Sequence, residues 1–308
     1  MTLRSVLLFP GQGAQAPGFL HALPEHEVAR ATLQEAQDIL QLNLGELDSA
    51  AALNSTVSVQ LGVLVAGVAY ARVLAASGAF PDAVAGLSVG AFTAAVASGA
   101  LDFGTALRLV RLRAEAMEEA YGKGGYGMLA ILGLREAAVQ TLVAGIARPD
   151  TPLYLASVNA PAEIIVAGSD VALTAAGEAA SRFGARARRL CVSVPSHGPL
   201  LEEVSSRLRE AMREVRLEPP RVPYISNVRA RALSGGADVA EDLILNVSRT
   251  VRWHESVTLL YELGARLFIE APPGHTLSNL VKNEFPQARA VAAADAQLDS
   301  VLHLADKR

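Results

Sequence analysis

A serine between two glycines is the first candidate for chemistry in this chain. The segment Gly86-Leu87-Ser88-Val89-Gly90 ends a short apolar stretch, residues 83–86, and precedes an apolar stretch with helical character. A GxSxG pattern between a strand and a helix is typical of a nucleophile elbow, in which the glycines allow a sharp turn that exposes the hydroxyl. The free N–H groups at the helix start then face the oxygen that forms on the serine. We predict Ser88 as a nucleophile; a tightly packed turn is the alternative.

A serine nucleophile needs a general base, and six histidines compete for that role. His197 follows an apolar stretch and Pro195-Ser196, in a loop punctuated by proline and glycine of the kind that often carries catalytic residues. We predict His197 as the base and keep His275, which follows Pro272-Pro273-Gly274, as the alternative. The remaining histidines lie in polar, terminal or helix-start settings that suit surface, packing or capping roles: His21, His26, His254 and His303.

Arg113 is the lone charge on the apolar face of a predicted helix over residues 103–121. At about 100° per residue, its neighbours within about 60° are all apolar, namely Ala106, Leu109, Val110, Ala116 and Met117. A guanidinium buried there is costly unless a carboxylate or several carbonyls meet it. One interpretation is an internal ion pair with a protein carboxylate. The other is a bidentate clamp for a substrate carboxylate, which suits arginine better than lysine.

Weaker signals surround these residues. Gln12 lies between two glycines directly after the first predicted strand, so its backbone N–H and that of Val89 would form a two-donor oxyanion hole; alone, such a segment is more often only a turn. The single cysteine, Cys191, excludes an internal disulfide and a cysteine-rich metal site, and the histidines show no HExxH pairing. We predict no metal site.

The elements that position these residues alternate between apolar strands and helical patterns, which is typical of an α/β fold with a parallel sheet. Strands are predicted over residues 5–9, 83–86, 224–227 and 266–270. Helices are predicted over residues 57–77 with Thr56 as the cap, 89–98, 103–121 with Asp102 as the cap, 200–215, 253–263 and 276–285.

The pattern changes in the middle of the chain. Residues 127–194 follow the order β-α-β-β-α-β, with strands at 127–132, 153–158, 163–167 and 185–194 and helices at 136–147 and 172–183. This order is that of a ferredoxin-like unit. We expect a small α+β subdomain over 126–195, inserted into a large α/β core formed by 1–125 and 196–308. Its last strand carries a basic patch that suits a solvated face, an acidic partner or CoA phosphates: Arg186, Arg188 and Arg189.

Composition limits the function classes. The chain has 308 residues, of which 51% are hydrophobic and 19% charged, which is enough for a sizeable core. A net charge of −4 argues against nucleic-acid binding. Residues 83–101 carry no charge, but their glycines favour a buried strand, turn and helix over a membrane span. The N-terminal apolar run is too short for a signal peptide, so we expect a soluble, cytoplasmic protein.

Five ordered segments resemble one enzyme family. They are FPGQGAQ (9–15), GLSVG (86–90), RLVRLRAEAM (108–117), SVPSHGPLL (193–201) and VRWHESV (251–257), and together they are similar to malonyl-CoA:acyl-carrier-protein transacylases. The resemblance implies a hydrolase-like core with a ferredoxin-like insert. It also implies malonyl-CoA as substrate, an acyl-carrier protein as partner, and no bound cofactor.

The resemblance assigns roles by position. Ser88 would be acylated, His197 would be the base and Arg113 would bind the malonyl carboxylate. The N–H groups of Gln12 and Val89 would form the oxyanion hole. In the family a glutamine backbone carbonyl orients the histidine, and here Asn246 falls at that place. This substitution preserves a main-chain role and leaves any side-chain role open.

Leu87 departs from the fatty-acid-synthesis enzymes, which usually have histidine before the serine. The segment GLSVGAF (86–92), together with YELGARLFIEAPPGH (261–275), resembles the malonyl-transferase (epsilon) subunit of bacterial malonate decarboxylase. That subunit loads a carrier protein whose thiol belongs to a phosphoribosyl-dephospho-CoA group, a phosphopantetheine-type arm, and works beside other decarboxylase subunits. We favour this assignment.

Four alternatives stay open. They are the transacylase of fatty-acid biosynthesis, an α/β-hydrolase esterase, a patatin-like lipase, and a scaffold that only docks a carrier protein. An esterase is expected to carry an HGGG-type loop, and a patatin-like lipase a DGG or DGA motif; neither occurs in the sequence.

Overall fold

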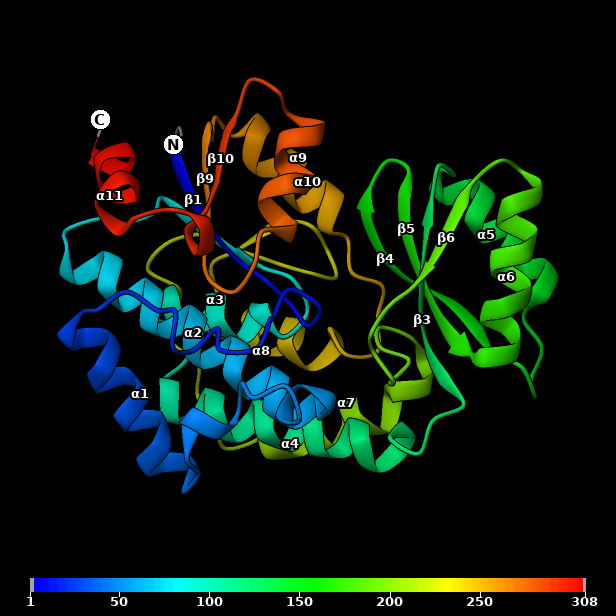
Figure 1. Ribbon diagram of the computed structural model, residues 1–308, viewed down its shortest axis with the longest axis horizontal. Coiled ribbons are helices and arrows are strands. Elements are labelled where there is room, and N and C mark those ends of the chain that lie inside the picture. The colour runs from blue at the N-terminus through cyan, green and yellow to red at the C-terminus, as the bar shows by residue number, and fades with distance from the viewer. Residues whose placement is uncertain (1–2, 307–308) are drawn as a thin grey trace.

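A twisted sheet of six strands forms the centre of the large unit in the computed structural model, which describes residues 3–306 (Figure 1). Its strand order is β10-β9-β1-β2-β7-β8, and all neighbours are parallel except β7 and β8. The parallel-sheet α/β core predicted from the sequence is therefore confirmed. The strands are β1 (Ser5–Phe9), β2 (Ala83–Gly86), β7 (Tyr224–Ile225), β8 (Ala232–Leu233), β9 (Leu267–Glu270) and β10 (Arg289–Ala292).

Helices cover both faces of this sheet, as the alternating side-chain directions along β1 show. Leu7 and Phe9 belong to the cluster formed with α2, α3 and α4, whereas Val6 and Leu8 belong to the cluster formed with α9 and α10. Successive side chains of a strand point to opposite faces, so one strand serves two cores. The helices of the large unit are α1 (Glu27–Leu40), α2 (Thr56–Ala76), α3 (Gly90–Ala97), α4 (Phe103–Tyr121), α7 (Glu202–Ala211), α8 (Gly236–Leu245), α9 (Trp253–Glu262), α10 (Thr276–Glu284) and α11 (Leu298–Asp306).

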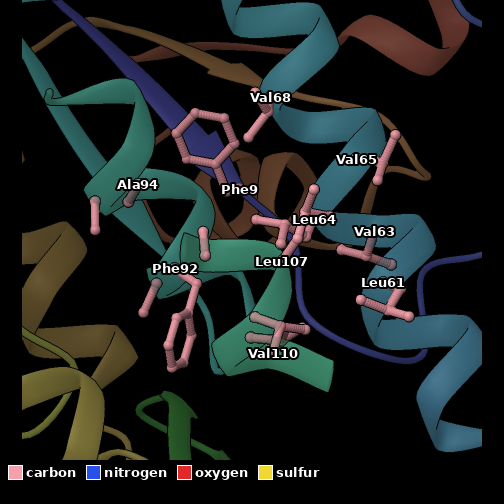
Figure 2. Packing of buried hydrophobic residues seen from close by; sticks show 14 of the residues in the cluster. Phe9, Leu61, Val63, Leu64, Val65, Val68, Phe92, Ala94, Leu107 and Val110 are labelled. Atoms are coloured by element: carbon pink, nitrogen blue, oxygen red, sulfur yellow. The ribbon is translucent and has the colours of Figure 1, made fainter. Parts of the chain in front are cut away.

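Helix α2 is the central helix of the larger core. Figure 2 shows its aliphatic side chains, among them Leu61, Leu64 and Val68, packed with Phe9 of β1 and with residues of α3 and α4. Within residues 3–306, α2 is the one helix long and apolar enough to cross a membrane, yet 78% of its most apolar window is buried inside the protein. It has the character of a core helix. The uncharged residues 83–101 form β2, a turn and α3, as predicted.

The small unit contains a four-stranded antiparallel sheet with the order β4-β5-β3-β6 and two helices, α5 (Glu136–Ile146) and α6 (Asp170–Arg182) (Figure 1). Its strands are β3 (Tyr126–Leu132), β4 (Leu153–Ala160), β5 (Glu163–Ser169) and β6 (Arg186–Arg189). The elements follow the predicted order β-α-β-β-α-β, and we propose residues 126–195 as the bounds of a ferredoxin-like subdomain.

Several predicted boundaries are wrong for local reasons. Strand β6 ends at Arg189 and does not run to residue 194; Leu190 still donates to the carbonyl of Met128 (3.0 Å), and the Tyr126 carbonyl accepts from the Arg189 guanidinium (2.9 Å). Ser55, not Thr56, caps α2, since its hydroxyl accepts from the N–H groups of Val57 and Ser58. The predicted helix over 200–215 is a 3₁₀ turn followed by α7, which ends at Ala211.

Five elements are absent from the prediction: α1, α8, β8, β10 and α11.

The small unit contacts the large one through hydrogen bonds at residue 251. Val251 donates to the carbonyl of Ala156 (2.9 Å) and accepts from the N–H of Val158 (2.9 Å), so it lies against β4 like an extra strand residue. Nearby, Arg252 forms an ion pair with Glu136 of α5 at 2.6 Å. The segment that follows α8 is thus held by the small sheet, and a cavity lies between the two units.

Candidate active site

The turn after β2 has the geometry of a nucleophile elbow. Ser88 adopts a φ of 56°, in the left-handed region that few non-glycine residues occupy. A Cβ atom on Gly86 would lie 2.0 Å from the carbonyl oxygen of Gly90, and one on Gly90 would lie 2.3 Å from the carbonyl oxygen of Phe9. Both flanking positions therefore require glycine, and the turn presses directly against the end of β1.

A cavity of about 350 Å³ opens at this turn. Its walls bring together four of the six residues that the sequence marked as candidates, namely Gln12, Ser88, Val89 and His197. Arg113 and Asn246, the other two, lie behind this wall and contact Ser88 or His197. The small unit supplies the opposite wall with apolar residues of its sheet and the arginines of β6: Met128, Ala130, Ile165, Arg188 and Arg189.

Arg113 is buried to 1% exposure next to the serine. Its Nη2 lies 3.2 Å from Ser88 Oγ, its Nη1 donates to Gln60 Oε1 at 2.5 Å, and its Nε has no partner. Burial lowers the pKa of the guanidinium to about 10, so it stays charged near neutral pH. In the described part of the chain Arg113 forms no ion pair, so the interpretation as an internal ion pair finds no carboxylate here. The arrangement provides a desolvated cation beside the hydroxyl.

His197 enters the cavity from the loop before α7. Its Nδ1 donates to the backbone carbonyl of Asn246 at 2.6 Å, which assigns the proton to Nδ1 and leaves Nε2 as the basic nitrogen. Burial, reinforced by the charge of Arg113, lowers the pKa of His197 to about 3, against the weaker raising effect of its bond to Asn246. The imidazole is therefore neutral near pH 7. His275, the alternative base, lies at the start of α10 with 59% of its side chain exposed and close to Asp295.

Two backbone N–H groups are free to face a developing negative charge. Among residues 3–306, neither Gln12 nor Val89 donates its N–H to a protein acceptor, and both residues line the cavity. A Cβ atom on Gly11 would lie 2.8 Å from the carbonyl oxygen of Leu87, which shows how closely the 10–13 turn packs on the elbow. Two unpaired N–H donors on neighbouring turns of the cavity wall are compatible with an oxyanion hole, which needs two such donors.

Asn246 contributes more than a main-chain carbonyl. Its side-chain Nδ2 donates to the carbonyl of Ser88 at 2.9 Å while its own carbonyl holds His197. Since the Ser88 carbonyl and the Val89 N–H belong to one peptide group, this bond also sets the direction of the Val89 donor. The side-chain role that the sequence left open therefore has a specific contact.

Sequence reasoning missed two residues of this site. Gln60 accepts from Arg113, and its one signal in the sequence is an amide inside the predicted helix over 57–77. Asn227 was predicted only as the end of a strand, yet its amide contacts both Ser88 and Gly86. Neither contact follows from spacing, because both partners are far apart in the chain.

No group of three or more His, Cys, Asp or Glu side chains suited to a metal ion occurs within residues 3–306. The chemistry available in the cavity is that of a serine hydroxyl, a neutral imidazole, two N–H donors and a buried cation.

Known proteins with the same arrangement of elements identify the family. A family model described as an acyl transferase domain matches residues 6–300. The malonyl CoA-acyl carrier protein transacylase of Bacillus subtilis (strain 168) is 35% identical over 295 residues, which cover 94% of this chain and 93% of the relative. The protein of the same name from Escherichia coli (strain K12) is 32% identical over 281 residues, which cover 89% and 91%.

Solved structures agree over nearly the whole chain. The acyl-carrier-protein S-malonyltransferase from Burkholderia pseudomallei 1710b matches with a TM-score of 0.92 at 36% identity, covering 98% of this chain and 100% of the other. A malonyl-transacylase in complex with its type II PKS acyl-carrier protein matches with a TM-score of 0.91 at 31% identity, covering 98% of each. By sequence and by fold, this chain belongs to the acyl transferase family and is an acyltransferase.

Proposed function

We propose that this enzyme moves a malonyl group from malonyl-CoA to the thiol of an acyl-carrier protein through a malonyl ester on Ser88. The observation that carries the proposal is the Arg113 guanidinium, which lies 3.2 Å from the Ser88 hydroxyl and pairs with no carboxylate in residues 3–306. A free carboxylate separated from a thioester carbonyl by one methylene fits this spacing. The names of the similar proteins support malonyl as the acyl group.

In the first half-reaction the His197 Nε2 takes the proton of Ser88 as Oγ attacks the thioester carbonyl. The N–H groups of Gln12 and Val89 stabilise the tetrahedral oxyanion. The C–S bond then breaks, and the sulfur leaves as the CoA thiol with the proton that His197 carried. Arg113 holds the malonyl carboxylate throughout and so fixes the carbonyl above the serine.

In the second half-reaction the thiol of the carrier arm enters the vacated cavity. His197 takes the thiol proton, sulfur attacks the malonyl ester, and Ser88 recovers its proton when the ester bond breaks. Each half-reaction moves the acyl group between sulfur and oxygen without changing its oxidation state, so this exchange needs neither a redox step nor a bound cofactor. The same groups therefore serve both directions of a ping-pong cycle.

Pathway is a second part of the proposal. The similar transacylases favour a carrier protein of fatty-acid or PKS type over the carrier of malonate decarboxylase. This is the alternative that the sequence analysis ranked second. The competing epsilon-subunit assignment depends on the segments 86–92 and 261–275, and Leu87 of the first lines the cavity beside Ser88. It would bring the phosphoribosyl-dephospho-CoA thiol and other decarboxylase subunits as partners. We place either activity in the cytoplasm, with no nucleic-acid or membrane partner.

Intact-mass measurement tests the reaction. After brief exposure to malonyl-CoA the wild-type chain is expected to gain one malonyl group, to gain far less acetyl from acetyl-CoA, and to gain neither when Ser88 is replaced by alanine. Addition of holo carrier protein should then remove the malonyl group, and the fatty-acid and decarboxylase carriers compared side by side identify the partner. Rapid hydrolysis of the ester without transfer to a thiol would favour an esterase. Carrier binding without any label on Ser88 would favour a scaffold.

A further inference from the structure

We propose that Asn227 is a positioning residue, anchored by Asp242, that holds the nucleophile elbow in its working geometry. This inference rests on the proposed function and adds residues that the steps above do not use. Asn227 touches the elbow backbone and lies outside the cavity wall, so it acts through Ser88 and not on the substrate.

The contact between Asn227 and the elbow is bidentate. Its Oδ1 accepts from the N–H of Ser88 at 2.9 Å, and its Nδ2 donates to the carbonyl of Gly86 at 2.6 Å. These two groups belong to the peptide groups on either side of Leu87. One side-chain amide therefore fixes both peptide planes that lead into the serine.

The sheet explains why a side chain is needed there. Strands β2 and β7 pair in parallel at Val84 with Tyr224 and at Ala85 with Ile225. Beyond this point the chain must turn out of the sheet to reach the φ of 56° at Ser88, so backbone pairing with β7 stops. Asn227, just past the end of β7, continues the ladder with its amide. It supplies the donor and acceptor that a further strand residue would have supplied.

Asp242 holds Asn227 in turn. Its carboxylate, 4% exposed, accepts from the backbone N–H of Asn227 (3.1 Å) and Val228 (3.2 Å), from the hydroxyl of Tyr224 (2.8 Å) and from the hydroxyl of Ser226. Four donors on a buried carboxylate form a rigid anchor for the segment after β7. The chain of contacts therefore runs from α8 through Asp242 and Asn227 to Ser88.

A positioning role makes a specific kinetic prediction. In Asn227→Ala the elbow loses both bonds, so the first turnover of Ser88 malonylation is expected to slow roughly 10- to 100-fold, as small misplacements of reacting groups do. The KM for malonyl-CoA should change less than about twofold, since Arg113 is untouched, and the label should still reach one group per chain. Rapid-quench intact mass gives both the rate and the final stoichiometry.

Asn227→Asp provides a measurement that would not change if Asn227 had only a structural role. An ionised carboxylate can accept from Ser88 but cannot donate to the carbonyl of Gly86, whereas a protonated carboxyl can do both. The malonylation rate of this variant is expected to rise relative to wild type as the pH is lowered. Thr32→Val, which removes a hydroxyl of similar burial on α1, is the control and should keep the wild-type rate.

Three results would overturn the inference. The first is a wild-type malonylation rate in Asn227→Ala, and the second is a final stoichiometry of label in Asn227→Ala that falls by the same factor as its rate. The third is a pH profile of Asn227→Asp that runs parallel to that of wild type. If Asn227→Ala does not fold, the pH profile of Asn227→Asp decides alone.

A small sulfonyl fluoride that modifies Ser88 provides a second rate of reaction at the same hydroxyl. If wild type reacts with it but takes no malonyl group, the proposed function fails, and the same variants still test the positioning role with that reagent.

Discussion

The guanidinium of Arg113 donates to the hydroxyl of Ser88 across 3.2 Å, from a position that is 1% exposed. A cation so placed raises the cost of any acyl group that brings no negative charge, because the charge then stays desolvated and uncompensated. It also lowers the pKa of His197, in addition to the larger effect of burial. In the proposed mechanism, selectivity for the acyl group and the protonation state of the base are therefore linked through one side chain.

Replacing Arg113 by alanine is expected to abolish the preference for malonyl over acetyl groups. Breaking a buried, hydrogen-bonded charge pair costs about 2–5 kcal/mol, which corresponds to roughly 30- to several-thousand-fold in the ratio of kcat/KM values. Single-turnover acylation of Ser88 by malonyl-CoA and by acetyl-CoA measures this ratio. Retention of the malonyl preference in Arg113→Ala would refute the role of this residue as the carboxylate clamp.

Gln60→Glu should turn the substrate clamp into an internal ion pair. The new carboxylate would meet the Arg113 Nη1, which now donates to Gln60 Oε1 at 2.5 Å, and would compete with the malonyl carboxylate. We expect malonyl-CoA to lose at least about tenfold in kcat/KM, equivalent to about 1.4 kcal/mol, with acetyl-CoA much less affected. Gln60→Met, which introduces no charge, is the matched control. Equal losses for both acyl groups would contradict the prediction.

The unfolding free energy should fall as the pH drops below about 6.5. Unfolded His197 takes up a proton near its ordinary pKa of 6.5, whereas the folded residue does so only near 3. Between these values the unfolded state binds the additional proton, so acid favours unfolding by up to about 1.4 kcal/mol per pH unit from this residue. Urea unfolding at several pH values, compared between wild type and His197→Gln, measures the effect. The variant should show the smaller slope; identical slopes would show that His197 does not carry it.

Gly90→Ala should be strongly destabilising. The added Cβ would lie 2.3 Å from the carbonyl oxygen of Phe9, and backbone on both sides prevents relief, so the loss in unfolding free energy should reach at least about 3 kcal/mol. The control is Gly145→Ala in α5, where a Cβ meets nothing within 4 Å and helix propensity favours alanine by up to about 1 kcal/mol. Chemical denaturation compares the two. A mild effect at Gly90 would mean that the elbow tolerates a shift away from β1.

Local patterns were sufficient to predict the framework of the site. The strand before Gly86 and the helix over 103–121 have the predicted bounds, because the apolar run ends in glycine and Asp102 caps the helix. The burial of Arg113 followed from helical periodicity alone. These features depend on neighbours within one or two turns of chain.

Contacts between distant segments could not be predicted in the same way. Gln60 and Arg113 are 53 residues apart, and Asn227 and Ser88 are 139 apart, so only the packing of α2 on α4 and of β7 beside β2 brings them together. The contact of the Arg189 side chain with the carbonyl of Tyr126, 63 residues away, likewise lies outside any local pattern. The resemblance to transacylases indicated the roles of several residues, but it did not point to Gln60 or Asn227, whose side-chain amides bond Arg113 and the elbow.

Within residues 3–306 Arg113 bonds Gln60 and Ser88 and no carboxylate, which has a practical consequence for assays. If Arg113 is the carboxylate clamp, we expect a small carboxylate ion from the medium to compete for the space that the acyl carboxylate needs. Acetate, formate and citrate should therefore inhibit competitively with malonyl-CoA, while amine sulfonate buffers of the same pH and ionic strength should not. Rates recorded in carboxylate buffers would understate the turnover of this enzyme.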